Sequence, residues 1–164
     1  MKRLLVMCAC LVVPVLSVWA EDTGVTFELT PPSTKTVREI AVRIEPLSEE
    51  QLRAGITVDM LHDAIQNQLQ TASIQINDSL LHPTLVLRMR TLQVGLDTAS
   101  FFQLSFLEEA MLVRNRSLFD ALTWSQASLL ACRPEDLKKE VVDTVTTMAQ
   151  AFVKDYVKAM QPIA

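Results

Sequence analysis

The sequence has 164 residues, of which 49% are hydrophobic and 21% are charged, with 15 basic side chains against 19 acidic ones. The resulting net charge of −4 argues against nucleic acid as a partner, because nucleic acids select strongly basic surfaces. It also supplies no polybasic patch for anionic lipids. Three glycines are too few for a glycine-rich phosphate loop.

The first twenty residues have the three-part pattern of a secretory signal peptide. Two basic residues precede an apolar stretch over residues 4–16, and small residues lead to a predicted cleavage after Ala20. An uncleaved anchor is less favoured, because the apolar stretch is short and contains Pro14. Lipidation at Cys10 is a second alternative, which would leave an apolar segment on the mature protein. We expect a periplasmic or secreted protein that is not integral to the membrane after cleavage.

Cleavage would leave Cys132 as the single cysteine of the mature chain. An exported domain with one cysteine has no internal disulfide, so its fold depends on packing. Cys132 follows an apolar run, which favours a buried and unreactive thiol. An intermolecular disulfide is the alternative.

A polar leader over residues 21–35 contains adjacent prolines and is expected to be flexible. A single folded domain is expected from residue 36 to residue 161. Its first strand is predicted around Ile40, Val42 and Ile44, which alternate with other residues at the period of a half-buried strand.

A helix is predicted from Val58 to Thr71, because Leu61, Ile65 and Leu69 recur at helical spacing. Thr57 stands directly before it and can accept a hydrogen bond from an unpaired backbone N–H of the first turn. This helix therefore has both an apolar face for a core and a defined start.

The apolar run from Phe101 to Ala131 is predicted to form an antiparallel hairpin broken at residues 115–117. Shorter strands are expected before it at residues 74–76 and 85–89. Within the first hairpin strand the apolar alternation slips at residues 107–109, which predicts a β-bulge there.

A long amphipathic helix is predicted to close the domain, with Pro134 as its first residue and its end near Met160. The element order predicts an α+β fold. We expect a two-layer sandwich, with the helices on one face of a mainly antiparallel sheet of about four or five strands. The first strand reaches the second by a crossover, which can place that pair in parallel.

Three motifs resemble a widespread family of small exported bacterial proteins of unknown function. Gly55-Ile56-Thr57 precedes a helix, Thr123-Trp124-Ser125 lies in the second hairpin strand, and Phe152 and Tyr156 stand four apart in the last helix. The family has a Gly-Leu-Thr segment opening a helix, a Thr-Trp on a strand and a closing Phe-x-x-x-Tyr helix. The layout is also similar to that of lipoproteins that assemble the cell envelope. Neither resemblance implies a catalytic residue.

A polar cluster in the first long helix is the strongest candidate for chemistry. Asp59, His62 and Gln66 lie within two turns, a spacing that allows a metal or an acid–base pair. The favoured alternative is a solvated helix face. Glu108 and Glu109 are adjacent and would point to opposite faces of a regular strand, which disfavours a carboxylate pair. A bulge at this point could bring them together, so a glycosidase-like pair stays an alternative without motif support. We assign no catalytic residue, metal or cofactor, and a hydrolase is the minority alternative.

Trp124 and Phe101 are the candidate contact residues. Either can anchor the sheet to its neighbours, as most aromatic side chains do, or meet a partner or ligand from an exposed position. We expect a non-enzymatic envelope protein that acts as an interaction or assembly module. The alternative is a carrier of an apolar ligand such as a lipid, held between helices and sheet. The methionines that could line such a cavity are Met60, Met89, Met111, Met148 and Met160.

Overall fold

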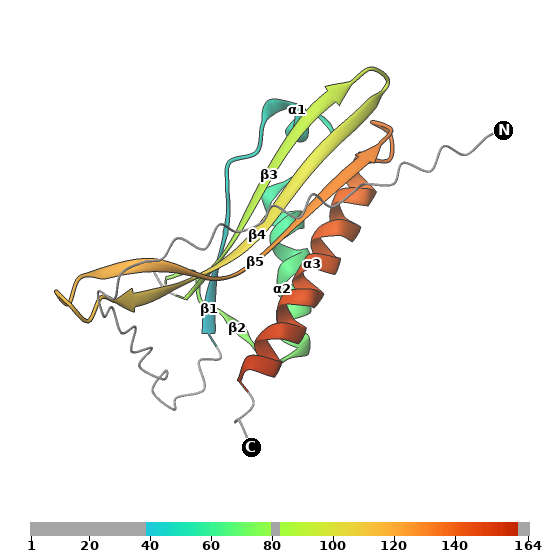
Figure 1. Ribbon diagram of the computed structural model, residues 1–164. Helices are drawn as coiled ribbons and strands as arrows, with labels where there is room; N and C mark the ends of the chain where they lie inside the picture. The colour runs from blue at the N-terminus through green and yellow to red at the C-terminus, as the bar shows by residue number, and fades with distance from the viewer. Residues whose placement is uncertain (1–38, 80–82, 161–164) are drawn as a thin grey trace, which may run out of the picture.

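The computed structural model describes residues 39–79 and 83–160, which form a five-stranded sheet covered on one face by helices (Figure 1). In chain order the elements are β1 (Glu39–Ile44), α1 (Glu49–Arg53), α2 (Val58–Thr71), β2 (Gln75–Ile76), β3 (Thr84–Val94), β4 (Asp97–Met111), β5 (Leu118–Cys132) and α3 (Leu137–Ala159). This arrangement confirms the predicted α+β sandwich with a long closing helix. The predicted signal peptide, Cys10 and the leader at 21–35 lie outside the described residues.

The strands follow the order β2-β1-β3-β4-β5 across the sheet. β1 pairs in parallel with both β2 and β3, while β3, β4 and β5 form long antiparallel pairs through two hairpins. The crossover through α2 therefore gives the parallel pair that its length allows. β5 and the two-residue β2 are the edges of the sheet.

Local capping explains where the first two helices begin. Ser48 and Gln51 form a reciprocal capping box at α1, and the Thr57 hydroxyl accepts a hydrogen bond from the Met60 N–H at 3.2 Å at the start of α2. Gly55 separates the two helices with a φ of +75°, a left-handed conformation that glycine adopts without strain. The predicted range of α2 is confirmed at both ends.

The prediction that Pro134 begins the last helix is wrong, since α3 starts at Leu137. Residues 134–136 instead form a turn, in which the Asp136 N–H donates to the Arg133 carbonyl at 3.1 Å. The fixed φ of proline suits a tight turn as well as a first helical turn, so its presence does not separate the two.

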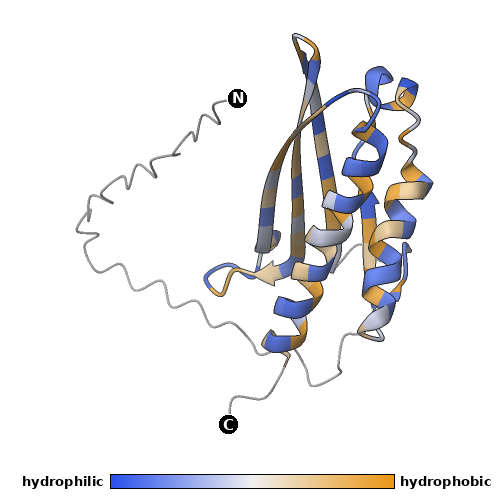
Figure 2. Ribbon diagram, turned by 90° about the vertical axis from the view of Figure 1, so that its right-hand side faces the viewer, coloured by the Kyte–Doolittle hydropathy of each residue, from blue (hydrophilic) through white to orange (hydrophobic). Residues whose placement is uncertain are grey.

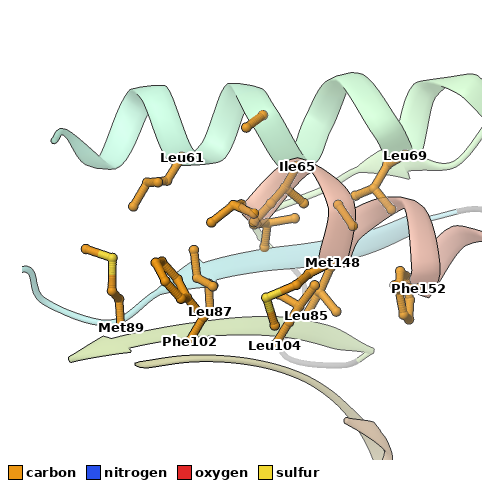
Figure 3. Close-up of a cluster of buried hydrophobic side chains, with 14 of the residues drawn as sticks. Leu61, Ile65, Leu69, Leu85, Leu87, Met89, Phe102, Leu104, Met148 and Phe152 are labelled. Atoms are coloured by element: carbon orange, nitrogen blue, oxygen red, sulfur yellow. The ribbon is translucent and has the colours of Figure 1, made fainter. Parts of the chain in front are cut away.

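The core lies between the sheet and the two long helices (Figure 3). Figure 2 shows that apolar and polar residues alternate along the strands and change every few residues along the helices. The fully enclosed side chains come from every large element except β5, and include Ile40, Leu61, Ile65, Leu69, Leu85, Leu87, Phe102, Leu104, Val141, Val145, Met148 and Phe152. Within residues 39–79 and 83–160, no helix is long and apolar enough to cross a bilayer.

The expected bulge is present, but its extra residue lies in the other strand. Phe106 of β4 pairs with Trp124, whereas the next residue, Leu107, pairs with Leu122. Thr123 of β5 is therefore the unpaired residue, and its hydroxyl donates to the Phe106 carbonyl at 3.5 Å. The predicted bulge in β4 is therefore wrong in its strand: β4 keeps its alternation, and Met111 is an exposed residue, 50% accessible, on the side away from the core.

Candidate functional site

Trp124 anchors the edge of the sheet to α3. Its indole ring meets Phe152 edge to face, with ring centroids 5.2 Å apart, and its Nε1–H donates to an Asp155 carboxylate oxygen at 3.1 Å. The side chain is half-buried. Both contacts belong to the fold, which favours the packing interpretation of Trp124.

Phe101 lies on the opposite face of the sheet, which the helices leave open. It is 40% exposed and pairs with Arg90 on one side and with Leu129, which is 75% exposed, on the other. Nearby, Arg88 and Arg90 both donate to the Glu45 carboxylate, at 2.8 and 3.1 Å. The hydrogen bond from Arg88 lowers the pKa of Glu45 below its ordinary value. The open face thus combines a fixed ionic network with an exposed apolar patch.

The three polar candidates of α2 do not converge. Asp59 lines a groove of 480 Å³ on the side of α2 that faces α3, whereas Gln66 lines a groove of 400 Å³ beside β2. His62 is directed to Asp78, with Nε2 3.6 Å from a carboxylate oxygen. The other oxygen of Asp78 accepts a hydrogen bond from the Val42 N–H at 3.2 Å. This geometry ties a turn to β1, while His62 Nε2 is buried and makes no hydrogen bond to the described residues.

A metal site and a reactive cysteine are the two other chemical possibilities. Among the described residues there is no cluster of three or more histidine, cysteine, aspartate or glutamate side chains that could hold a metal ion. Burial raises the pKa of the half-buried Cys132 thiol, and the nearby carboxylates of Glu140, Asp136 and Asp97 raise it further. The thiol, predicted to be buried, is half-buried, and its raised pKa leaves less of the nucleophilic thiolate at neutral pH.

Beyond the bulge, residues 107–122 form what we call the hairpin arm. The arm reaches away from the helices, toward the left of Figure 1. It is apolar although it is exposed: the exposed fractions are Met111 50%, Val113 53%, Leu118 61%, Phe119 40% and Leu122 58%. Sequence patterns did not assign this apolar feature as a site.

The conformation of the arm is fixed by its own backbone. The strands pair up to Met111 and Leu118, and the turn is closed by the Leu112 N–H, which donates to the Ser117 carbonyl at 2.9 Å. Arg116 occupies the left-handed region with a φ of +56°. Arg114 and Arg116 place two cations at the tip. The result is a preformed surface of apolar and arginine side chains.

The arm results from unequal strand lengths. β4 and β5 each have 15 residues, whereas β3 has 11. The excess length lies beyond the neighbouring strand, because Thr84 at the start of β3 pairs with Leu107. In that excess β4 pairs only with β5 and no longer with β3.

Glu108 and Glu109 sit at the base of the arm and point to opposite sides, as expected of adjacent strand residues. Glu108 is on the helix side, where its charge adds to burial in raising the pKa of Tyr156. Glu109 is exposed and pairs with Asp120. The two glutamates therefore do not form a carboxylate pair.

A third groove runs between β5 and α3. It has a volume of 250 Å³, and we call it the edge groove; its lining residues are Gln126, Ala127, Ser128, Asp143, Thr144, Thr147 and Met148. The side-chain oxygen of Gln126 is buried and has no hydrogen-bond partner. The edge groove therefore holds an acceptor that the monomer leaves unused.

No protein-family model matches the sequence, and no curated protein matches it. Among solved structures, the chain is similar to the crystal structure of a minor lipoprotein from Acinetobacter baumannii, with a TM-score of 0.42 and 12% sequence identity. The match covers 78% of this chain and 96% of that one. The resemblance to a family of exported proteins stays a prediction.

Proposed function

We propose that this protein is an exported, non-enzymatic binding module of the cell envelope, and that the hairpin arm is its contact surface for a partner protein. The exposure of five large apolar side chains on one preformed arm carries this proposal. Met111, Leu118 and Leu122 share one side of the arm, and Phe119 lies on the other side. Exposed apolar side chains gathered in this way are typical of interaction sites.

The residue types of the arm favour a protein partner. Aromatic, methionine and arginine side chains are enriched in the centres of protein interfaces. The arm supplies Phe119, Met111, Arg114 and Arg116. Its strand pairs and closed turn are formed before binding, so little conformational entropy is lost when a partner docks.

The placement of the methionines favours contact through the arm over ligand carriage. Met89 and Met148 are enclosed in the packed core, where they contact helix and sheet residues. Met111 and Met160 are exposed, and Met60 lines a groove whose other residues are mostly polar. The five side chains are thus distributed over core, surface and groove.

Native mass spectrometry of the protein, purified gently from the envelope fraction of its own host, tests the proposal. We expect a mass that includes a second, different polypeptide. The double variant Val113→Asp, Leu118→Asp should lose that polypeptide, because a carboxylate placed in an apolar contact must be desolvated. Leu96→Asp is the matched control, since Leu96 is also exposed but lies in the turn between β3 and β4.

The control variant should keep the partner. Retention of the partner by the double variant would remove the arm from the interface. A bound lipid in place of a polypeptide would favour the carrier function instead. Far-ultraviolet circular dichroism of both variants checks that each is folded, so a loss of binding is not mistaken for unfolding.

A further inference from the structure

We propose that two copies of this chain pair through their β5 strands, antiparallel, about a two-fold axis at Ser128. The pairing would join the two sheets into one of ten strands. This inference goes beyond the proposed function, because it uses the edge of the sheet and leaves the hairpin arm free.

The first observation is an unprotected edge. In the described part of the chain, β5 pairs only with β4, so its outer row of backbone N–H and C=O groups has no partner strand. Natural sheets usually protect such an edge with charged residues, proline or a very short strand. From Trp124 to Cys132 the strand has nine residues and contains no charge, proline or glycine. The opposite edge, β2, follows the rule, since it has two residues.

The second observation fixes the register. The bulge at Thr123 interrupts the strand, so Trp124 to Cys132 is its regular part, and Ser128 is the middle residue. Antiparallel pairing of this segment with its own copy about Ser128 uses every regular residue. Even-numbered residues then face even-numbered residues of the second copy, and odd-numbered residues face odd-numbered ones. The helix side and the open face of the two sheets are therefore both continuous.

The side chains are complementary in this register. On the open face Ala127 meets Leu129 of the second copy, so a small residue lies beside a large exposed one. On the helix side Gln126 is diagonal to Ser128 of the second copy, a separation within reach of long side chains. The Gln126 oxygen is enclosed and has no hydrogen-bond partner in the described part of the monomer, and a rotation of its side chain into the edge groove would let it accept a hydrogen bond from that serine hydroxyl. The pairing therefore fills the edge groove and satisfies its acceptor.

The size of the contact predicts a weak dimer. Nine residues span about 30 Å of strand. A strip of that length would bury roughly 900 Å² in total, below the range of about 1,200–2,000 Å² of stable interfaces and within that of weak, transient ones. Association in the micromolar range is therefore expected, with the dimer appearing as the protein is concentrated.

Cysteine cross-linking tests the axis directly. In a Cys132→Ser background, Ser128→Cys should give a disulfide-linked dimer on mild oxidation, because residues facing one another across antiparallel strands have Cα atoms about 4.5–5.5 Å apart. Ser125→Cys is the matched control. The two substituted positions would lie six residues apart along the paired strands, a distance of about 20 Å. This variant should therefore not form the disulfide-linked dimer.

Sedimentation equilibrium of the protein with its native residues gives an independent test. We expect a reversible monomer–dimer equilibrium, and Ala127→Lys should weaken it at least tenfold by placing a charge on the edge. Ala159→Lys, at the exposed end of α3, should leave it unchanged. A protein that stays monomeric up to high micromolar concentration overturns the proposal. A dimer that resists Ala127→Lys, or that cross-links equally well through Ser125→Cys, overturns it too.

Discussion

Replacement of Phe152 by alanine should be among the most damaging single changes in the domain. Phe152 is enclosed between α3 and the sheet, and its ring contacts three other aromatic rings: Phe106, Trp124 and Tyr156, at centroid distances of 5.0, 5.2 and 5.4 Å. Removing a buried phenylalanine side chain costs about 3–5 kcal/mol, because burial of the ring is lost and a cavity remains. Out of a total stability of about 5–15 kcal/mol, that loss leaves a marginal protein.

Urea unfolding of the chain beginning at Glu21 measures this loss. In that chain Trp124 is the only tryptophan, so its fluorescence reports on the cluster, and far-ultraviolet circular dichroism supplies a second probe. The expected loss corresponds to a fall in melting temperature of about 10–20 °C. Phe119→Ala is the matched control on the exposed arm and should cost about 1 kcal/mol or less. A loss for Phe152→Ala below about 2 kcal/mol would refute the view that the four rings pack as a unit.

Three further substitutions test other parts of the fold. Gln51→Ala should cost about 2–3 kcal/mol in urea unfolding, because the buried amide caps α1 and donates to the Thr91 hydroxyl at 3.1 Å. Thr57→Ala should cost about 1 kcal/mol through loss of the α2 cap, and Thr57→Ser should restore most of it. Tyr156→Phe should reduce the loss in free energy of unfolding as the pH is raised above about 10. Burial, with a contribution from Glu108, raises the pKa of Tyr156. The stability conferred by the neutral phenol is therefore complete below about pH 10 and is lost as the pH rises through the folded pKa. An unchanged loss of stability at alkaline pH would contradict this assignment.

Local sequence patterns were sufficient for most elements of the fold. The range Val58–Thr71 follows from helical spacing and a threonine cap, both of which act within a few residues. The outward position of Phe101 follows from the alternation of Phe102, Leu104 and Phe106, because adjacent strand residues must face opposite sides. Where the physical cause is local, the sequence predicts it.

Features that depend on distant pairing were not predicted correctly or were missed. The bulge residue is Thr123, and it is defined only by comparing β5 with β4. The exposure of the hairpin arm depends on where β3 and the helices end, which no pattern within the arm specifies. Likewise, Asp59 and Gln66 share a helix, but neighbouring elements place them in separate grooves. Their separation is a property of the tertiary structure.

The position of α3 at the end of the described chain has a consequence for the order of folding. Val145, Met148 and Phe152 complete the core, yet they are synthesised after every strand of the sheet. At about 5–20 residues per second, roughly 6–20 s pass between synthesis of β1 and of Phe152. During that interval the apolar faces of α2, β3 and β4 lack their final cover. The core can therefore close only after α3 has been synthesised, and until then these apolar faces stay exposed.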